Sequence, residues 1–369
     1  MKDTTKQVQA PKRINSIDAV RASALLMIIF THSVIGFWSG ASRECLTFAD
    51  TACEFVRHYI TADVGFGMFS FLFGLSFFLQ LDHAEARGID FRGRFCWRLV
   101  LLIGFAFLDR LCYRGDILGL FATMGFALVC VWKLKTKHLV ILCAVCMLQL
   151  VPLLWHFANL PTAEEVFAYP VAPDPQHAKW STIAKWNTTY GFWDYAITYA
   201  ATGRYWAVLG FFLLGTLAGR LRIFERGIGA IRKLVVPLAL IWCSCSAIAY
   251  LIHVDRVFHW WRCSAQVALF VVCLACLYEY PPVAKRISCL RAIGRCTLTG
   301  YISQNAFMCA LLYGWGLGLG TSLGISQRVL LGLCVYVLQM LFFSLWMRRF
   351  KFGPLEGIWR KLTKFGMKQ

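Results

Sequence analysis

The sequence of 369 residues contains little charge, and acidic residues are especially scarce. Asp, Glu, Lys and Arg make up 15% of the chain, against roughly 25% in ordinary soluble domains. Hydrophobic residues make up 59%, so a water-soluble fold is excluded. These residues run in continuous blocks rather than alternating, which excludes a transmembrane β-barrel. The 30 Phe and 14 Trp residues exclude a disordered chain.

The hydrophobic blocks predict membrane-spanning helices, because about 20 apolar residues cross the core of a bilayer as a helix. We therefore expect an all-α fold, a polytopic transmembrane helical bundle of about ten spans. The predicted spans are residues 19–38, 58–81, 95–111, 115–132, 138–156, 205–221, 234–253, 263–280, 297–320 and 328–347.

The formal net charge of +19 raises the question of a nucleic-acid partner, but the placement of the basic residues indicates membrane topology instead. Most of the 38 Lys and Arg residues lie in the two terminal tails and in alternate loops between the predicted spans. By the positive-inside rule, both termini are then cytoplasmic. We expect the lipid bilayer as a partner and no nucleic acid.

The whole chain is predicted to be a single membrane domain, because no soluble segment or internal repeat interrupts the spans. Residues 1–18 form a cytoplasmic tail, 157–204 an exterior aromatic-rich loop and 348–369 a basic cytoplasmic tail. The aromatic loop is typical of a segment in the lipid interface, which either covers the outer mouth of a cavity or only anchors neighbouring spans. A disulfide between Cys45 and Cys53, which share an exterior loop, is an open alternative.

Ionisable side chains inside predicted spans indicate chemistry, because each costs about 3 kcal/mol to insert into a bilayer. Arg21 and His32 share the first span. Their separation of eleven residues places them within about 20° of the same helix face and about 16.5 Å apart along the axis. A pair with Asp18 would explain Arg21 without a function. His32, between Thr31 and Ser33, is not typical of packing against lipid.

Further charges gather at the outer ends of the predicted spans, at roughly the level of His32. They include Asp63, Asp109 and Asp116. A histidine with nearby carboxylates fits a general base oriented by an aspartate, and it also fits a proton relay in a transporter. Interfacial ion pairs that serve only topology are the structural alternative.

A polar run, Thr297–Asn305, opens the ninth predicted span on the cytoplasmic side. The run, which includes Gln304, is explained either by hydrogen bonding between helices or by the wall of a ligand entrance. Arg291 and Arg295 precede it, and arginines at this level suit the phosphates of a ligand.

Short motifs along the chain carry a resemblance to a known family. They are Ser16–Arg21, Met68–Gly74, Arg114–Leu118, Gly294–Tyr301 followed by Gln304, Tyr313–Gly318, and Phe352–Glu356 followed by Trp359-Arg360 and Leu362-Thr363. In this order they resemble the YeiB-like membrane proteins, domain of unknown function number 418, within a superfamily of transmembrane acyltransferases. The chain departs from the usual family pattern at Ala22, Phe121 and Gly357, where Gly, Tyr and Trp are typical. It also departs at His32, near which the family often carries Asn.

The resemblance implies transfer of an acyl group from cytoplasmic acyl-CoA, such as acetyl-CoA, to a small-molecule acceptor on the exterior face of a bacterial inner membrane. The spacing of Arg21 and His32 also resembles the acyltransferase-3 family, whose first span carries Arg, ten residues and then His. By this resemblance His32 takes the proton of the acceptor or briefly carries the acyl group. Asp63, Asp109 or Asp116 then orients the imidazole ring.

The predicted cofactor site comprises Arg21, Arg291 and Arg295, which meet the phosphates of the coenzyme, together with Gln304. We expect no metal. Two other functions stay open: a small-molecule or proton-coupled transporter or channel that uses the same His/Asp/Arg cluster, and a non-catalytic membrane assembly protein. The acceptor, the acyl chain, the oligomeric state and enzymatic activity itself are open from the sequence.

Overall fold

The computed structural model describes residues 15–37, 46–158, 171–224, 228–252 and 255–365. Within these ranges the chain forms helices and no β-strand. In chain order the elements are α1 (Asn15–Thr31), η1 (His32–Gly36), α2 (Phe48–Val56), η2 (Arg57–Thr61), α3 (Val64–Glu85), α4 (Arg92–Arg110), α5 (Leu118–Val131), α6 (Thr136–Met147), α7 (Leu150–Phe157), α9 (Trp180–Thr188), α10 (Tyr190–Ala201), α11 (Arg204–Arg220), α12 (Ile228–Arg232), α13 (Val235–Ile252), α14 (Asp255–Tyr278), α15 (Pro281–Arg286), η3 (Ile287–Cys289), α16 (Leu290–Arg295), α17 (Thr297–Leu312), α18 (Ile325–Arg349) and α19 (Pro354–Phe365).

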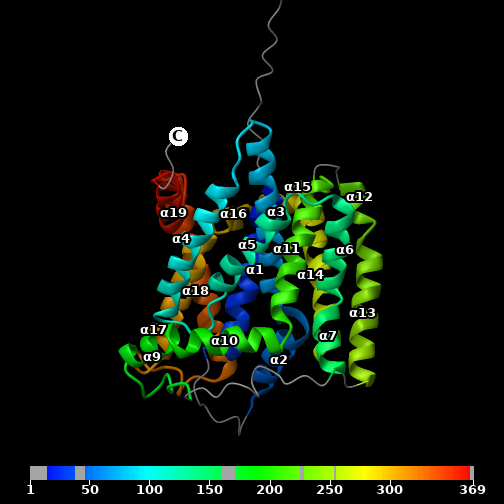
Figure 1. Cartoon of the computed structure of the whole chain (residues 1–369). Coiled ribbons are helices and arrows are strands. Elements are labelled where there is room, and N and C mark those ends of the chain that lie inside the picture. Colours follow the sequence, from blue (N-terminus) through cyan, green and yellow to red (C-terminus); the bar gives the residue numbers. More distant parts are fainter. Residues whose placement is uncertain (1–14, 38–45, 159–170, 225–227, 253–254, 366–369) are drawn as a thin grey trace, which may run out of the picture.

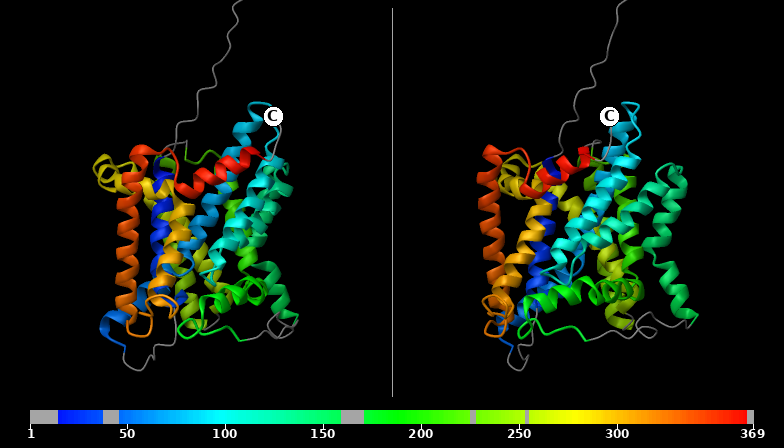
Figure 2. Two further views of the ribbon diagram at one scale, coloured as in Figure 1. Left: turned by 90° about the vertical axis from the view of Figure 1, so that its left-hand side faces the viewer. Right: turned by 60° about the vertical axis from the view of Figure 1, so that its left-hand side comes forward.

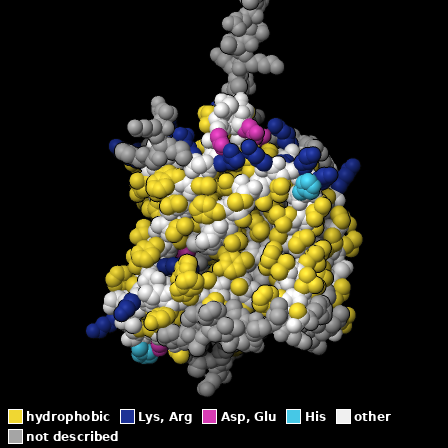
Figure 3. Space-filling view, viewed as in Figure 1, with side chains coloured by type: hydrophobic (Ala, Val, Ile, Leu, Met, Phe, Trp, Pro, Cys, Tyr) yellow, Lys and Arg dark blue, Asp and Glu magenta, His cyan; other side chains and the backbone are white. Residues whose placement is uncertain are grey.

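The long helices run side by side and form a bundle with two end faces (Figure 1). One end carries α12, α15, α16 and α19, and the other carries α9 and α10. Lys and Arg gather at the rim of the first end, while apolar side chains cover the side of the bundle (Figure 3). We call the first end the basic face and the second the opposite face. The helix α19 lies across the bundle at the basic face, directly after the long α18 (Figure 2).

Four helical stretches are long and apolar enough to cross a membrane. They are Ser16–Ile35, Phe48–Glu85, His259–Tyr278 and Ile325–Arg349. Helices also occupy the other predicted span ranges, among them the shorter apolar helices α5, α6 and α13. The all-α class is confirmed, whereas the count of ten spans and the cytoplasmic placement of the termini stay predictions.

The predicted span 138–156 is two helices, α6 and α7, rather than one. The chain turns between them at Gln149, which has a positive φ of 54°. Pro152 explains the break. In a continuous helix its ring would clash with the carbonyl of the residue four positions earlier, and proline has no amide hydrogen to donate to that carbonyl.

The predicted span 297–320 also ends early, at Leu312, where α17 stops. The following glycine-rich segment turns back on itself, and the amides of Gly316 and Gly318 both donate to the carbonyl of Tyr313 at 3.0 Å. Gly318 has a φ of +65°, a conformation that glycine adopts without steric cost.

The predicted exterior loop 157–204 contains two helices, α9 and α10, which lie across the opposite face (Figure 1). The amide of Asn187 donates to the carbonyl of Arg110 at 3.0 Å, and Arg114 pairs with Asp194 at 2.6 Å. These bonds fasten the two helices to the end of α4. Cys45, one partner of the possible disulfide with Cys53, lies outside the described ranges. Most of the predicted tail 1–18 lies outside them as well.

The helices α3 and α11 pack with their backbones in contact. A Cβ atom added to Gly74 would lie 1.9 Å from the carbonyl oxygen of Phe212, and one added to Gly215 would lie 1.9 Å from the carbonyl oxygen of Phe71. This contact fixes α3 in the bundle, and another face of α3 lines the cavity described next.

Candidate functional site

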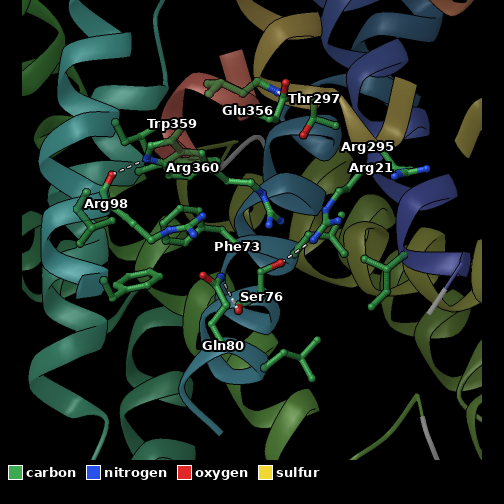
Figure 4. Close-up of a pocket in the computed structure, with 18 of the residues that line it drawn as sticks. Arg21, Phe73, Ser76, Gln80, Arg98, Arg295, Thr297, Glu356, Trp359 and Arg360 are labelled. Carbon is green, nitrogen blue, oxygen red and sulfur yellow. Dashed lines mark hydrogen bonds between the residues drawn. The ribbon is translucent and has the colours of Figure 1, made fainter. Parts of the chain in front are cut away.

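A cavity of about 1150 Å³ lies among α1, α3, α4, α5, α16, α17 and α19 and reaches the loops of the basic face. Basic side chains dominate its charged lining (Figure 4). They are Arg21, Arg87, Arg94, Arg98, Arg222, Arg295, Lys351 and Arg360. The acidic lining residues are Asp18, Asp82 and Glu356. The cavity therefore favours a ligand with several negative charges.

The lining of the cavity changes from charged to apolar with depth. On α3 the lining residues extend from Ala84, near the basic face, to Phe69, a separation of about 22 Å at 1.5 Å per residue. Below Ser76 the α3 lining is apolar over about 10 Å. The lining of α4 changes in the same direction, from Arg98 to Leu102. A charged head near the mouth and a long uncharged part deeper inside would suit this gradient.

Arg21 lies in the wall of this cavity, where the lining changes from charged to apolar. Its Nη1 donates to Asp18 at 3.2 Å, as the spacing of three residues predicts. Its Nη2 donates to the hydroxyl of Ser76, on α3, at 2.6 Å. The predicted ion pair between Arg21 and Asp18 is therefore present. Arg21 nevertheless still lines the cavity.

The other predicted cofactor residues are distributed unevenly. Arg295 lines the cavity and donates through Nη2 to the carbonyl of Lys351 at 2.9 Å. Arg291, four residues earlier on α16, is not among the lining residues. Gln304 is fully buried on α17 away from the cavity wall, and its amide atoms make no hydrogen bond within the described ranges.

The carboxyl-terminal helix α19 forms one wall of the cavity. None of its residues was predicted as a site residue from the sequence. Trp359 donates through Nε1 to the carbonyl of Arg98 at 3.1 Å, and the Arg98 guanidinium lies 4.4 Å from the Trp359 ring centre. Arg360 lies 4.0 Å from the ring centre of Phe352. The family motif Phe352–Glu356 with Trp359-Arg360 was the available signal, and four of its residues line the cavity: Phe352, Glu356, Trp359 and Arg360.

His32 lies beyond the deep end of the cavity, in the short π-helical segment η1 that follows α1. Its ring centre is 4.9 Å from that of Tyr113, 5.7 Å from Phe37 and 6.5 Å from Tyr301. Its Nδ1 atom is buried without a hydrogen-bonding partner in the described part of the chain. The side chain of Asn305 lies beside the imidazole.

Two of the predicted aspartates, Asp109 and Asp116, are buried and bond to groups other than this histidine. Asn305 donates through Nδ2 to both carboxylate oxygens of Asp109, at 3.2 and 3.0 Å. Asp116 accepts from the amides of Leu118 and Gly119, at the start of α5, and lies 3.5 Å from Arg110. Asp109 therefore reaches the surroundings of His32 through Asn305, while Asp116 caps a helix.

The third aspartate, Asp63, forms a charged cluster with Arg204 and His259, and Asp63 and Arg204 also act electrostatically on His32. Asp63 precedes α3 with a positive φ of 56°. One carboxylate oxygen accepts from Arg204, at the start of α11, and the other lies 2.9 Å from Nε2 of His259, on α14. The guanidinium of Arg204 also stacks on aromatic rings, including Phe66 at 4.8 Å. Sequence reasoning did not single out His259, because only the fold brings α14 beside the start of α3.

None of the three predicted aspartates donates to or accepts from His32 directly in the described ranges. The structure thus separates the predicted residues into a cavity group, with Arg21 and Arg295, and an inner group around His32. Asp109 reaches this inner group through Asn305, and Asp63 acts on His32 electrostatically. Within the described part of the chain, no cluster of three His, Cys, Asp or Glu residues is close enough to hold a metal ion.

Comparison with known proteins matches residues 214–366 to the family described as protein of unknown function (DUF418). The chain is 26% identical over 357 residues to the uncharacterized 39.9 kDa protein in the amylase 3' region of Bacillus acidopullulyticus, covering 95% of this chain and 94% of that one. It is 24% identical over 388 aligned positions to the uncharacterized protein YxaH of Bacillus subtilis strain 168, with the same coverage of 95% and 94%. A shorter match, 32% identical over 79 residues, covers 21% of this chain and 20% of the uncharacterized protein YeiB of Escherichia coli strain K12.

Proposed function

The chain belongs to the YeiB-like DUF418 family, and we propose that it is a membrane acyltransferase that takes an acyl group from acyl-CoA, such as acetyl-CoA, at its basic face. The basic face is cytoplasmic, in a bacterial inner membrane, and a small-molecule acceptor enters from the exterior face. The observation that carries the proposal is the cavity, which has eight basic residues in its lining and an apolar deep end.

The chemistry of acyl-CoA matches this gradient. Its phosphates carry several negative charges, for which arginine supplies paired N–H donors and a permanent positive charge. Its pantetheine arm is long, narrow and uncharged, and suits the part of the cavity beyond Arg21 and Arg98. The thioester is at the end of that arm, so an extended coenzyme would bring the reacting carbon toward the deep end, where Tyr301 lies.

In this proposal His32 acts as the general base. The neutral imidazole takes a proton from a hydroxyl or amine of the acceptor, whose oxygen or nitrogen then forms a bond to the acyl carbon. The carbon–sulfur bond breaks, and the thiolate of coenzyme A leaves and takes up a proton. Asn305, held by Asp109, keeps the ring in place.

The test is binding of coenzyme A and acetyl-CoA to the detergent-purified protein, measured by calorimetry and thermal shift. We expect Arg21→Gln and Arg295→Gln each to weaken binding about tenfold, because a charge-assisted hydrogen bond contributes about 1.5 kcal/mol or more. Arg291→Gln is the matched control, since Arg291 is on the same short helix as Arg295 and outside the cavity lining. Absence of binding up to millimolar ligand, or equal weakening in the control, would contradict the proposal.

A second candidate is proton-coupled transport, favoured by the cluster of Asp63, Arg204 and His259. Charged clusters of this kind inside helical bundles are typical of ion and proton pathways. If coenzyme A does not bind, and a pH gradient drives uptake into vesicles that Asp63→Asn abolishes, transport replaces acyl transfer as the proposed function.

A further inference from the structure

Tyr301 lies between the basic-face cavity and His32. It is a lining residue of the basic-face cavity, together with Thr297 and Leu298 from the start of the same helix. Its ring also contacts that of His32, with 6.5 Å between the ring centres. Asn305 is one turn further along α17, about 6 Å away along the axis, and is not part of the cavity wall. The cavity therefore ends at the level of Tyr301.

The polar side chains of His32 and Asn305 lie beyond the Tyr301 ring, outside the cavity lining. His32 keeps part of its surface accessible, yet it is not among the residues that line the cavity. In the described part of the chain, its Nδ1 and the Oδ1 of Asn305 are buried without hydrogen-bonding partners. Buried polar atoms in proteins are normally satisfied by protein or by ordered water. Because the His32 and Asn305 side chains lie beside each other, they satisfy part of each other's bonding. The accessible surface of His32, outside the cavity lining, therefore indicates a place for water or for a polar ligand beside the ring.

The wall between the cavity and His32 is aromatic and tightly packed. Tyr301 is 3% exposed, Tyr113 is 2% exposed and Phe37 is fully buried. The ring centres of Phe37 and Tyr113 are 5.0 Å apart, and that of Tyr113 is 4.9 Å from the ring centre of His32. The hydroxyl of Tyr301 accepts a hydrogen bond from the amide of Ile117 at 3.4 Å, and Ile117 is itself a lining residue.

We propose that the Tyr301 ring is the barrier between the basic-face cavity and the polar space around His32, and that its hydrogen bond to Ile117 holds it closed. Displacement of the ring opens the path along which the reactive end of a cavity ligand reaches His32. This last step rests on the proposed function, whereas the barrier itself does not depend on the identity of the ligand.

The experiment labels cysteines in sealed membrane vesicles with a charged, membrane-impermeant thiol reagent added to one face at a time, and quantifies each labelled peptide by mass spectrometry. His32→Cys reports on the far side of the barrier. Ser76→Cys is the matched control, because Ser76 lines the cavity directly. Peptide-level detection separates both positions from the 16 native cysteines.

With reagent at the basic face, we expect Ser76→Cys to react whether or not Tyr301 is changed, and His32→Cys to be protected behind native Tyr301. Addition of Tyr301→Ala should raise the rate at position 32 at least tenfold. Addition of Tyr301→Phe, which keeps the ring and removes only the hydroxyl, should raise it about threefold, as expected for loss of one weak hydrogen bond.

Labelling of Ser76→Cys in the Tyr301→Ala background shows that the cavity still forms, and Tyr301→Phe provides a variant that keeps the packing volume. Rapid reaction of His32→Cys from the basic face behind native Tyr301 would overturn the proposal. Rates at position 32 that neither Tyr301 variant changes would overturn it as well. Both readings are independent of coenzyme A, so failure of the barrier and failure of the acyl-transfer function are separate outcomes.

Discussion

The carboxylate of Glu356, in α19, accepts a hydrogen bond from the hydroxyl of Thr299, in α17, at 2.6 Å. It also accepts from the backbone amides of Leu298 at 2.7 Å and of Thr299 at 3.1 Å. The first amides of a helix have no partner within that helix. The helix α19, at the basic face, therefore supplies the amino-terminal cap of α17, the helix that also carries Tyr301 and Asn305.

Replacement of Glu356 should destabilise the protein through loss of this cap. We expect Glu356→Ala to lower the free energy of unfolding by about 1–2 kcal/mol, in the range of helix caps, measured by thermal unfolding in detergent. The control is the neighbouring Gly357→Ala, whose added Cβ meets no atom within 4 Å. An unchanged melting temperature in Glu356→Ala would contradict the capping role.

The same carboxylate gives a pH dependence with a defined sign. Burial raises the pKa of Glu356, against the opposing effect of the hydrogen bonds from Thr299 and Leu298. The folded protein then holds this proton to a higher pH than the unfolded chain does. The contribution to stability is complete below the unfolded pKa of about 4.3 and is lost as pH rises through the folded pKa. The stability of wild type relative to Glu356→Gln should therefore fall from pH 4 to pH 7, and a rise would contradict it.

Backbone contact between α3 and α11 predicts a contrast between two glycines. Gly74→Ala should destabilise the protein by about 2 kcal/mol or more, because its Cβ would lie 1.9 Å from the carbonyl oxygen of Phe212 and the two helices would have to separate. Gly104→Ala, in α4, meets nothing within 4 Å and should be neutral or stabilising by up to about 1 kcal/mol through helix propensity. Equal melting temperatures for the two variants would show that the contact is not rigid.

The sequence predicted the helical class because that class depends on local features. Each predicted span is a run of apolar residues long enough to form a helix, and each departure has a local cause. Pro152 and the positive φ of Gln149 divide one span, and the glycines after Tyr313 shorten another. The terminal bounds were harder to predict, because the ends of helices depend on caps such as Glu356 that come from distant parts of the chain.

The site was predicted only in part, since its geometry depends on contacts between distant residues. The eleven-residue spacing separates Arg21 and His32 along the first helical segment, and the structure adds that Arg21 meets Ser76, 55 residues away. Arg291 and Arg295 were equivalent in the sequence, but only Arg295, at the end of α16, lines the cavity. The role of Asn305 depends on a partner 196 residues away, which no local pattern indicates.

Replacement of the neighbouring side-chain amides Asn305 and Gln304, on α17, should affect the free energy of unfolding differently. Asn305 donates to both oxygens of Asp109, which is 2% exposed. Asn305→Leu would leave this carboxylate without the donor and should cost about 3 kcal/mol of unfolding free energy. Gln304→Met, of similar shape, should be neutral or stabilising, because the Gln304 amide is buried and makes no hydrogen bond in the described ranges. Thermal unfolding of both variants in detergent measures the difference.

An exchange of the two side chains separates the Asp109–Asn305 bond from general packing. Asn305→Asp alone would place two carboxylates together and should destabilise strongly, whereas Asp109→Asn with Asn305→Asp restores one charge and one amide at the same contact. We expect the double variant to recover most of the loss, with a coupling free energy of about 1–3 kcal/mol in a double-mutant cycle of thermal unfolding. Additive effects would mean that Asp109 and Asn305 act independently, and Asp109 would then have no route through Asn305 to the imidazole of His32.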